Sequence, residues 1–239
     1  MTPLYYDLHL HSCLSPCGDD DMTPANIVGM AKLKGLDVIA ITDHNSCQNC
    51  VAAMFHAKQH DIILLPGMEL TTAEEVHVIC LFSELVPALA FDAYVSKQIL
   101  PIKNREDIFG KQQILDKQDN VVGTIEHLLI HATNISFDDV FPLVESYGGI
   151  AFPAHVDKPS NSLLSNLGFI PPTSTFQSAE FHDLKHLHKL QKKHPYFETC
   201  NIICNSDAHY LEDIHEPEYR LFAASKKETD ILMALERKG

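Results

Sequence analysis

The sequence has no long apolar run and few positively charged residues. No stretch approaches the ~18 consecutive apolar residues of a membrane-spanning helix, and the first residues lack the basic and apolar regions of a signal peptide. We therefore expect a cytoplasmic protein with no membrane partner. Only 18 Lys and Arg stand against 32 Asp and Glu, which gives a formal net charge of −14. Because duplex DNA is held mainly through its phosphates, stable binding of duplex DNA is not expected.

Several motifs of common binding and catalytic sites are also missing. The sequence has no glycine-rich phosphate loop, no HExxH motif and no stripe of interleaved aromatic and basic residues. Its seven cysteines come without a signal peptide, so a disulfide framework is not expected. Cys47 and Cys50 have CxxC spacing, but no second pair follows at the spacing of a zinc ribbon. We interpret this pair as the opening of a helix.

Histidine, by contrast, is abundant. The chain contains 15 histidines, almost as many as its 18 lysines and arginines together. Its 239 residues, of which 45% are hydrophobic and 21% charged, are typical of one folded domain. Histidine is the side chain that most often binds metal ions near neutral pH. The composition therefore directs attention to metal ligands.

The hydrophobic pattern predicts an α/β fold with parallel strands and a helical insertion. Short apolar strands are expected at 4–10, 38–42, 62–66, 75–82, 150–154, 202–206 and 220–223. Helices are expected between the first three strands, near 183–193 and at the end of the chain. Strand signals are few between the fourth and fifth strands, where we predict helices at 88–100, at 112–132 and after Ser136. The sequence thus predicts a single domain, 1–239, with a helical insertion at 84–147.

The first predicted strand ends in two histidines on one face. Asp7, His9 and His11 alternate in the segment DLHLH, and alternate residues of a strand point the same way, roughly 6.5–7 Å apart. Two imidazoles on one face can hold one metal ion. Asp7 is expected to hydrogen-bond the ring of such a ligand from behind.

Further histidine and acidic residues follow the other predicted strands. The segments ITDHN, PGMEL, VHV, AFPAH and NSDAH contribute His44, Glu69, His77, His155, Asp207 and His209. The carboxyl ends of strands in parallel sheets and barrels meet on one face, where binding sites form. We therefore expect these side chains to converge with those of His9 and His11.

Six segments that carry these residues resemble a known family. DLHLHS, ITDHNS, PGMEL, VHVICLF, AFPAHVDK and NSDAH occur in the order of the motifs of the PHP (polymerase and histidinol phosphatase) superfamily, and they span nearly the whole chain apart from the insertion. The resemblance implies a distorted (β/α)7 barrel, TIM-like, whose strand ends hold up to three divalent metal ions. It also implies one site made of His9, His11, Glu69 and Asp207, a second made of Glu69, His77 and His155, and a third served by His44 and His209.

The remaining ligand of the third site is open. Many members of the superfamily place a His or Asp in the loop after the HxH motif, where this sequence reads SPCGDDD. Spacing from His11 favours Cys17 slightly, whereas charge favours Asp19, Asp20 or Asp21. A thiolate suits zinc, and a carboxylate suits manganese, iron or magnesium.

The implied chemistry is hydrolysis of a phosphoester by two or three divalent metal ions, zinc, manganese or iron, with magnesium as a further option. Asp207 and His209 are candidates for proton transfer. Lys158, three residues after His155, is a candidate for binding the phosphate, and Arg220 is a weaker one.

The expected substrate is a small phosphomonoester or the phosphate end of a nucleotide or short oligonucleotide. Within the same class of hydrolases, histidinol phosphate is an alternative substrate. Cleavage of C–N bonds by a related metallohydrolase would use the same residue types. A non-catalytic, metal-stabilised regulatory module is the alternative from another class, and the completeness of the ligand set argues against it.

Overall fold

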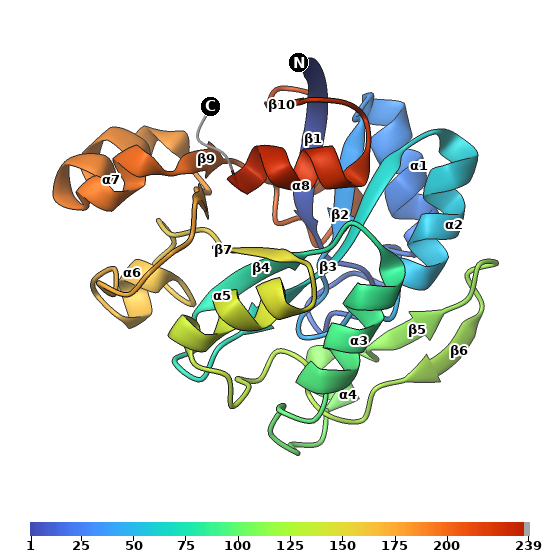
Figure 1. Ribbon diagram of the computed structural model, residues 1–239. Coiled ribbons are helices and arrows are strands. Elements are labelled where there is room, and N and C mark those ends of the chain that lie inside the picture. The colour runs from blue at the N-terminus through green and yellow to red at the C-terminus, as the bar shows by residue number, and fades with distance from the viewer. Residues whose placement is uncertain (237–239) are drawn as a thin grey trace.

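The computed structural model describes residues 1–236 and shows a mixed α/β fold around a curled β-sheet (Figure 1). Six strands form the main sheet in the order β10-β1-β2-β3-β4-β7, and two small sheets pair β5 with β6 and β8 with β9. The strands are β1 (Thr2–Leu10), β2 (Val38–Ile41), β3 (Ile63–Thr71), β4 (His77–Leu81), β5 (Gln113–Leu115), β6 (Val121–Thr124), β7 (Ile150–Pro153), β8 (Ser178–Glu180), β9 (Asn201–Ile203) and β10 (Arg220–Ala223).

The helices lie mainly on the outside of the sheet. They are α1 (Pro24–Lys34), α2 (Cys50–His60), α3 (Leu85–Val95), α4 (Glu106–Phe109), α5 (Phe137–Ser146), α6 (Leu163–Asn166), α7 (Leu187–Lys193) and α8 (Glu228–Glu236). In α1 the Thr23 side chain caps the amino end, and Gly35, with φ of 83°, ends the helix. Within residues 1–236 no helix is both long enough and apolar enough to cross a membrane.

Backbone hydrogen bonds close the strands into a distorted barrel. Just after β7, Val156 N donates to Glu180 O at the end of β8 (2.8 Å). Just after β1, His11 N donates to Ala208 O beyond β9 (3.0 Å). These contacts join β1, β2, β3, β4, β7, β8 and β9 into a ring at one rim. The predicted distorted (β/α)7 barrel is confirmed.

The predicted parallel pairing holds for β1 with β2, β2 with β3 and β8 with β9, but it is wrong for β4. This strand runs antiparallel to both β3 and β7. The turn from Thr72 to Val76 between β3 and β4 is too short for the helical crossover that parallel strands require. As a result, β4 begins at the rim where β3 ends, and His77 at its start reaches that rim.

The prediction of a helix at 112–132 is also wrong, because β5 and β6 form a hairpin there (Figure 1). Asp116 Oδ1 accepts hydrogen bonds from Gln118 N (2.8 Å) and Asn120 N (2.9 Å), which stabilises a turn in place of a helix. The Gln112 side chain then holds the following irregular segment by bonding Ile125 O, His127 O and Leu129 N. The helices predicted on either side of this hairpin are present as α3 and α5.

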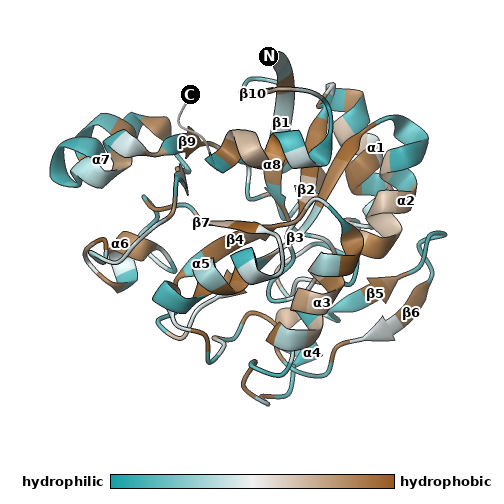
Figure 2. Cartoon of the chain, in the orientation of Figure 1, coloured by the Kyte–Doolittle hydropathy of each residue, from teal (hydrophilic) through white to brown (hydrophobic). Residues whose placement is uncertain are grey.

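The sheet separates two hydrophobic clusters, one under the outer helices and one inside the barrel. Apolar residues run through the central strands, and α1, α2 and α7 carry polar residues outside (Figure 2). Leu4, Tyr6 and Leu8 pack in the inner cluster, whereas Leu10 packs in the outer one. The register between β1 and β2 shifts between Asp7 and Leu10, which indicates a bulge. Because a bulge changes the phase of a strand, the histidines at the end of β1 face inward.

Candidate metal centre

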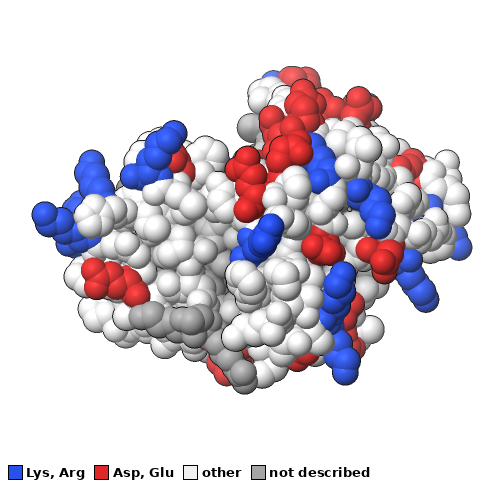
Figure 3. All heavy atoms as spheres, turned by 90° about the horizontal axis from the view of Figure 1, so that it is seen from above, with Lys and Arg blue, Asp and Glu red and all other residues white. Residues whose placement is uncertain are grey.

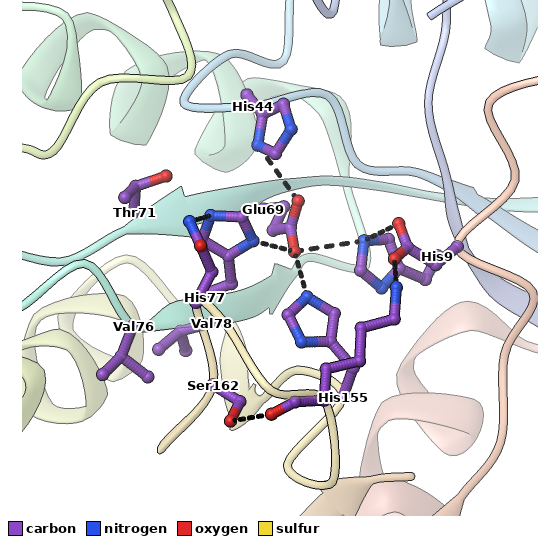
Figure 4. A network of polar contacts seen from close by, with 12 residues as sticks. His9, His44, Glu69, Thr71, Val76, His77, Val78, His155 and Ser162 are labelled. Atoms are coloured by element: carbon purple, nitrogen blue, oxygen red, sulfur yellow. Dashed lines mark hydrogen bonds and ion pairs between the residues drawn. The ribbon is translucent and has the colours of Figure 1, made fainter. Parts of the chain in front are cut away.

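A buried carboxylate lies at the centre of the rim. Glu69, in β3, is 1% exposed, and its two oxygens contact ring nitrogens of five histidines from four segments. The distances to Glu69 are 3.3 Å for His9 Nε2, 3.3 Å for His11 Nε2, 3.0 Å for His44 Nδ1, 2.7 Å for His77 Nδ1 and 3.1 Å for His155 Nε2. Four of these rings surround the carboxylate in Figure 4.

Backbone geometry brings Glu69 to this position. Residues 63–66 of β3 pair with β2, and residues 67–71 pair with β4. Where β3 exchanges one neighbour for the other, a Cβ on Gly67 would lie 2.4 Å from Cys80 O. Glycine is therefore required for the close approach of β4. In the PGMEL segment, the glycine thus allows β3 to pair first with β2 and then with β4. The glutamate of the same segment places its side chain at the rim.

The first group of potential ligand atoms combines residues from near both ends of the chain. His9, His11, Glu69 and Asp207 each offer an atom within 4.8 Å of every other. Asp207 Oδ1 lies 3.2 Å from the Nε2 atoms of both histidines. The expectation that His9 and His11 share one face is therefore confirmed, since their Nε2 atoms are 3.1 Å apart.

A second group contains Cys17. His11, Cys17, His44 and His209 also have ligand atoms within 4.8 Å of one another, and His209 Nε2 lies 3.0 Å from Cys17 Sγ. The neighbouring aspartates have other contacts: Asp20 pairs with Lys111, and Asp19 Oδ1 accepts a bond from Asp21 N. In the described part of the chain, the loop thus contributes its thiol to such a group and none of its three carboxylates.

A third group contains His44, Glu69 and His77. His155, which the resemblance places beside Glu69 and His77, contacts the same carboxylate without joining a group. His44 therefore belongs to two groups and links the Cys17 side of the rim to the β4 side.

The support for His9 comes from a residue that the sequence analysis did not single out. Glu180, 1% exposed at the end of β8, places its oxygens 3.1 and 3.0 Å from His9 Nδ1. Asp7 does not have the role predicted for it. Its carboxylate accepts hydrogen bonds from Ser206 N and His215 N, both 3.1 Å. The bulge between Asp7 and Leu10 leaves Asp7 on the opposite face of β1 from the two histidines.

A second support holds His11. Its Nδ1 lies 2.9 Å from Ser15 Oγ, which donates to Asp43 Oδ1 at 2.7 Å. Ser12 also binds Asp43 through its backbone N (2.7 Å) and its hydroxyl (2.6 Å). The Asp43 of the ITDHN segment therefore shapes the loop after β1, whereas its neighbour His44 faces the cluster. Such outer hydrogen bonds fix the orientation of a ligand ring.

Two residues of the rim have left-handed backbone. His155 has φ of 27° and Asp207 has φ of 54°, a region that residues other than glycine seldom adopt. Each directly follows the strand-end segment that leads into the rim. Strained backbone of this kind tends to occur at functional sites, where the surrounding structure holds it.

Burial and opposite charges act against each other in this cluster. Burial alone would raise the pKa of Glu69, but the histidines around it outweigh burial and hold the pKa well below its usual value. Burial lowers the pKa of His77 to about 4 and the pKa of His209 to about 3, so both rings are neutral near pH 7. For His11, burial is outweighed by Asp207 and Glu69, which raise its pKa to about 9. Protons and cations therefore compete for this site.

The donor set fits divalent metal ions. His44 Nδ1 faces Glu69 at 3.0 Å yet has no hydrogen-bond partner among the described residues. The buried His155 Nδ1 also has no hydrogen-bond partner among them, and the Nε2 of that ring is the atom that contacts Glu69. Imidazole nitrogens that face one another and a common carboxylate are arranged as ligands of a shared cation. The cluster is therefore able to hold metal ions.

Of the two basic residues considered for phosphate binding, only Lys158 reaches the rim. Its Nζ is paired with Asp207 Oδ2, and its side chain is 28% exposed. Arg220 lies in β10, opposite Tyr5 at the other end of β1, and its guanidinium stacks on the Tyr5 ring at 4.6 Å. His9 lies four positions along β1 from Tyr5, roughly 13 Å away, so Arg220 is excluded from the site. Cys47 and Cys50 are buried at the start of α2, and among the described residues neither belongs to a group of potential metal ligands.

A sequence model of the PHP domain family matches residues 7–158. The chain is 33% identical over 89 residues to an uncharacterized protein of Methanocaldococcus jannaschii, a match that covers 34% of this chain and 52% of that protein. It is 34% identical over 77 residues to a 5'-3' exoribonuclease of Haemophilus influenzae, which covers 31% and 27% of the two chains. The matches span about half or less of the length of these relatives.

Solved structures share the fold over almost the entire chain. The lesion-specific endonuclease Q of Pyrococcus furiosus superimposes with a TM-score of 0.68 at 18% identity, over 98% of this chain and 56% of that one. A proposed metal-dependent phosphoesterase of Bifidobacterium adolescentis superimposes with a TM-score of 0.58 at 16% identity, over 96% and 94%. At these identities the likeness shows the fold alone.

Proposed function

Because the chain belongs to the PHP domain family, we propose that it is a metal-dependent phosphoesterase. Its substrate in this proposal is a small phosphomonoester or the phosphate end of a nucleotide or short oligonucleotide. The observation that carries the proposal is Glu69, a buried carboxylate within 3.3 Å of nitrogens from five histidines. An anion so placed is suited to bridging cations, and the similarity to an exoribonuclease favours a nucleotide-containing substrate.

We assign the metal ligands from the three groups described above. One ion would be held by His9, His11, Glu69 and Asp207, and a second by Glu69 with His77, His44 and His155 around it. Cys17, His209, His11 and His44 would hold a third. Zinc, manganese and iron suit the imidazole-rich sites, and the thiol makes zinc the preferred ion of the third.

Bound there, the metal ions would supply a water ionised near neutral pH and would neutralise charge on the phosphoryl group. The protein's own residues prepare the site for this chemistry. The Glu180 carboxylate accepts a hydrogen bond from His9 Nδ1–H and so favours the tautomer of the neutral ring that has its lone pair on Nε2. His209 Nδ1 donates to Asp207 O at 2.8 Å, so its Nε2, 3.0 Å from Cys17 Sγ, carries the lone pair that would bind a metal. Lys158 adds a cation beside Asp207 for a phosphate oxygen.

The proposal is tested by measuring metal content and hydrolysis on one preparation. We expect two or three divalent ions per chain, hydrolysis of phosphomonoesters or oligonucleotide ends, and loss of activity with a chelator. The substrate panel should include mononucleotides, histidinol phosphate, short single strands and an amide. Hydrolysis of the amide but of no phosphoester would contradict the proposal, as would a metal-loaded protein without any hydrolytic activity.

Lys158→Ala is expected to raise KM for phosphomonoesters about tenfold while kcat changes less. An acidic chain repels anions at long range, so binding depends on the cations placed in the site, and a charged hydrogen bond contributes about 1.5–3 kcal/mol. The measurement is steady-state kinetics of the metal-loaded protein. Arg220→Gln is the control and should leave KM unchanged, because Arg220 lies at the other end of β1. An equal effect of both changes would remove Lys158 from the site.

Cys17→Ser is expected to lower occupancy of the third metal site. A serine hydroxyl is a much weaker ligand than a thiolate, whereas the other two groups do not contain Cys17. In cobalt-substituted protein, the thiolate-to-metal absorption band should disappear while most of the metal stays bound. Asp20→Asn is the control from the same loop. If Asp20→Asn removed that metal and Cys17→Ser did not, the thiol would not be the ligand.

A further inference from the structure

A basic segment lies beside the metal centre of this acidic protein. Residues 182–194, here called the α7 segment, contain four lysines, four histidines and one aspartate. The lysines are Lys185, Lys189, Lys192 and Lys193, and all four are exposed. The segment thus has a formal net charge of +3 in a chain whose total is −14. In the view from above, blue side chains gather at the left edge, where α7 lies in Figure 1 (Figure 3).

The lysines have few partners within the protein. Lys185 pairs at 3.6 Å with Asp183, and both side chains are well exposed. For Lys189, Lys192 and Lys193 no ion pair occurs with any residue from 1 to 236. Lys192 and Lys193 lie in the last turn of α7, where the helix dipole favours cations, but Lys185 and Lys189 do not. Helix stability alone therefore does not account for the four charges.

The α7 segment is attached to the loop that enters the metal centre. Asp157 lies between His155 and Lys158, and its side chain is 2% exposed. Its carboxylate accepts hydrogen bonds from His182 N (2.7 Å) and Asp183 N (2.9 Å), and it lies 3.0 Å from His186 Nδ1. One buried carboxylate thus fixes the start of the basic segment against the loop that carries Lys158.

A hollow lies between the α7 segment and the loop that carries Lys158. It has a volume of about 330 Å³, and Lys158, Ser165, His186, Lys189 and Leu190 are among the residues that line it. Of these, Lys158 is paired with Asp207 of the metal centre, and Lys189 belongs to α7. Lys193 follows Lys189 by four residues and so lies on the same helical face, about 6 Å further along. Lys158, Lys189 and Lys193 therefore place cations at the metal centre, in the hollow and on the surface of α7.

We propose that the α7 segment binds the backbone phosphates of a single-stranded oligonucleotide whose reacting phosphate occupies the metal centre. This inference rests on the proposed phosphoesterase function and narrows its substrate class. A mononucleotide has no further backbone phosphates with which to reach Lys189 and Lys193, whereas the following nucleotides of a strand do. A single strand also fits better than a duplex, because the ligand atoms are buried at the rim and a paired strand would have to separate to reach them. Basic grooves that follow the backbone are the usual means of binding single strands.

The test compares two double variants of the full chain. K189Q/K193Q removes two charges from the α7 segment, and K32Q/K58Q removes two exposed lysines from α1 and α2 on the far side of the molecule. With metal-loaded protein and a short oligouridine, K189Q/K193Q should raise KM about tenfold at low salt, and K32Q/K58Q should not. KM for uridine monophosphate or another mononucleotide should stay unchanged in both. The slope of log(kcat/KM) against log salt should become shallower by about 1.4 in K189Q/K193Q.

Equilibrium binding separates this inference from the proposed function. Fluorescence anisotropy of labelled oligouridine, with and without chelator, should show weaker binding to K189Q/K193Q than to the control in both conditions. Wild-type protein that hydrolyses no phosphoester would overturn the proposed function. Equal KM, salt slope and binding in the two variants, with hydrolysis intact, would overturn only the role of the α7 segment. Displacement of the strand by polyglutamate at the same charge concentration would also overturn it, in favour of an acidic protein partner.

Discussion

Glu69→Gln is expected to abolish most metal binding and to slow phosphoester hydrolysis by roughly 10³-fold, more than the 10–100-fold typical of losing an outer partner of a ligand. The amide keeps the shape of the side chain but carries no negative charge. Five imidazole nitrogens now within 3.3 Å would then face a neutral group that offers one acceptor oxygen. Two groups of ligands contain Glu69, so both lose their shared anion at once.

The measurement is metal content per chain together with kcat/KM, on protein whose fold is checked by circular dichroism. Glu145→Gln, an exposed change of the same kind on α5, is the matched control and should retain metal and activity. A Glu69→Gln protein with full metal content and near wild-type turnover would show that Glu69 does not bridge the ions.

Glu180→Leu is expected to lower metal affinity and activity by about 100-fold, and Glu180→Gln by about tenfold. The leucine removes both the charge and the acceptor behind His9 Nδ1, whereas the glutamine retains an acceptor oxygen. Without this partner the His9 ring can rotate or adopt the tautomer whose proton is on Nε2, the atom that faces Glu69 and Asp207. Metal titration of the apo-protein, followed by activity at saturating metal, separates lost affinity from lost turnover.

Asp7→Asn is the control for this comparison. Asp7 is as buried as Glu180 and only two residues from His9, but it binds backbone amides of Ser206 and His215. In Asp7→Asn the side-chain NH2 group of asparagine would face one of these backbone N–H groups. We expect this change to lower the free energy of unfolding by about 1–3 kcal/mol and to leave metal affinity unchanged. If Asp7→Asn weakened metal binding as much as Glu180→Leu, the assignment of the outer partner would be wrong.

The contrast between Asp7 and Glu180 marks where sequence reasoning reaches its limit. His9, His11, His44, Glu69, Asp207 and His209 are adjacent to recognisable strands, and local pattern was sufficient to place them on one rim. Glu180 belongs to a strand of three residues with no alternation to reveal it, and its contact with His9 spans 171 positions in the sequence. The bulge in β1, which turns His9 and His11 inward and leaves Asp7 on the other face, has no marker in the segment DLHLH.

The direction of β4 and the hairpin in the insertion illustrate a second limit. An apolar run such as VHVICLF predicts a strand but says nothing of its orientation, which here follows from the short turn before it. In the segment at 112–132, helix-compatible residues outnumber strand formers, but two sets of hydrogen bonds favour a hairpin. The local bonds of Asp116 stabilise the turn, and the Gln112 side chain holds the return segment through contacts between more distant residues, which the sequence pattern does not reveal.

The anchoring of the α7 segment by Asp157 has a consequence for redesign. The carboxylate recognises two backbone amides, at positions 182 and 183, and one ring nitrogen from His186. Backbone amides are the same whichever side chains follow, so the attachment point is nearly independent of the charges on the helix. A replacement segment would therefore need to present two consecutive amides to Asp157 and to keep the apolar packing of Leu187 and Leu190 against the core. Under the proposal above, substrate preference and metal-binding chemistry would then belong to separable parts of the chain, with Asp157 as an anchor between them.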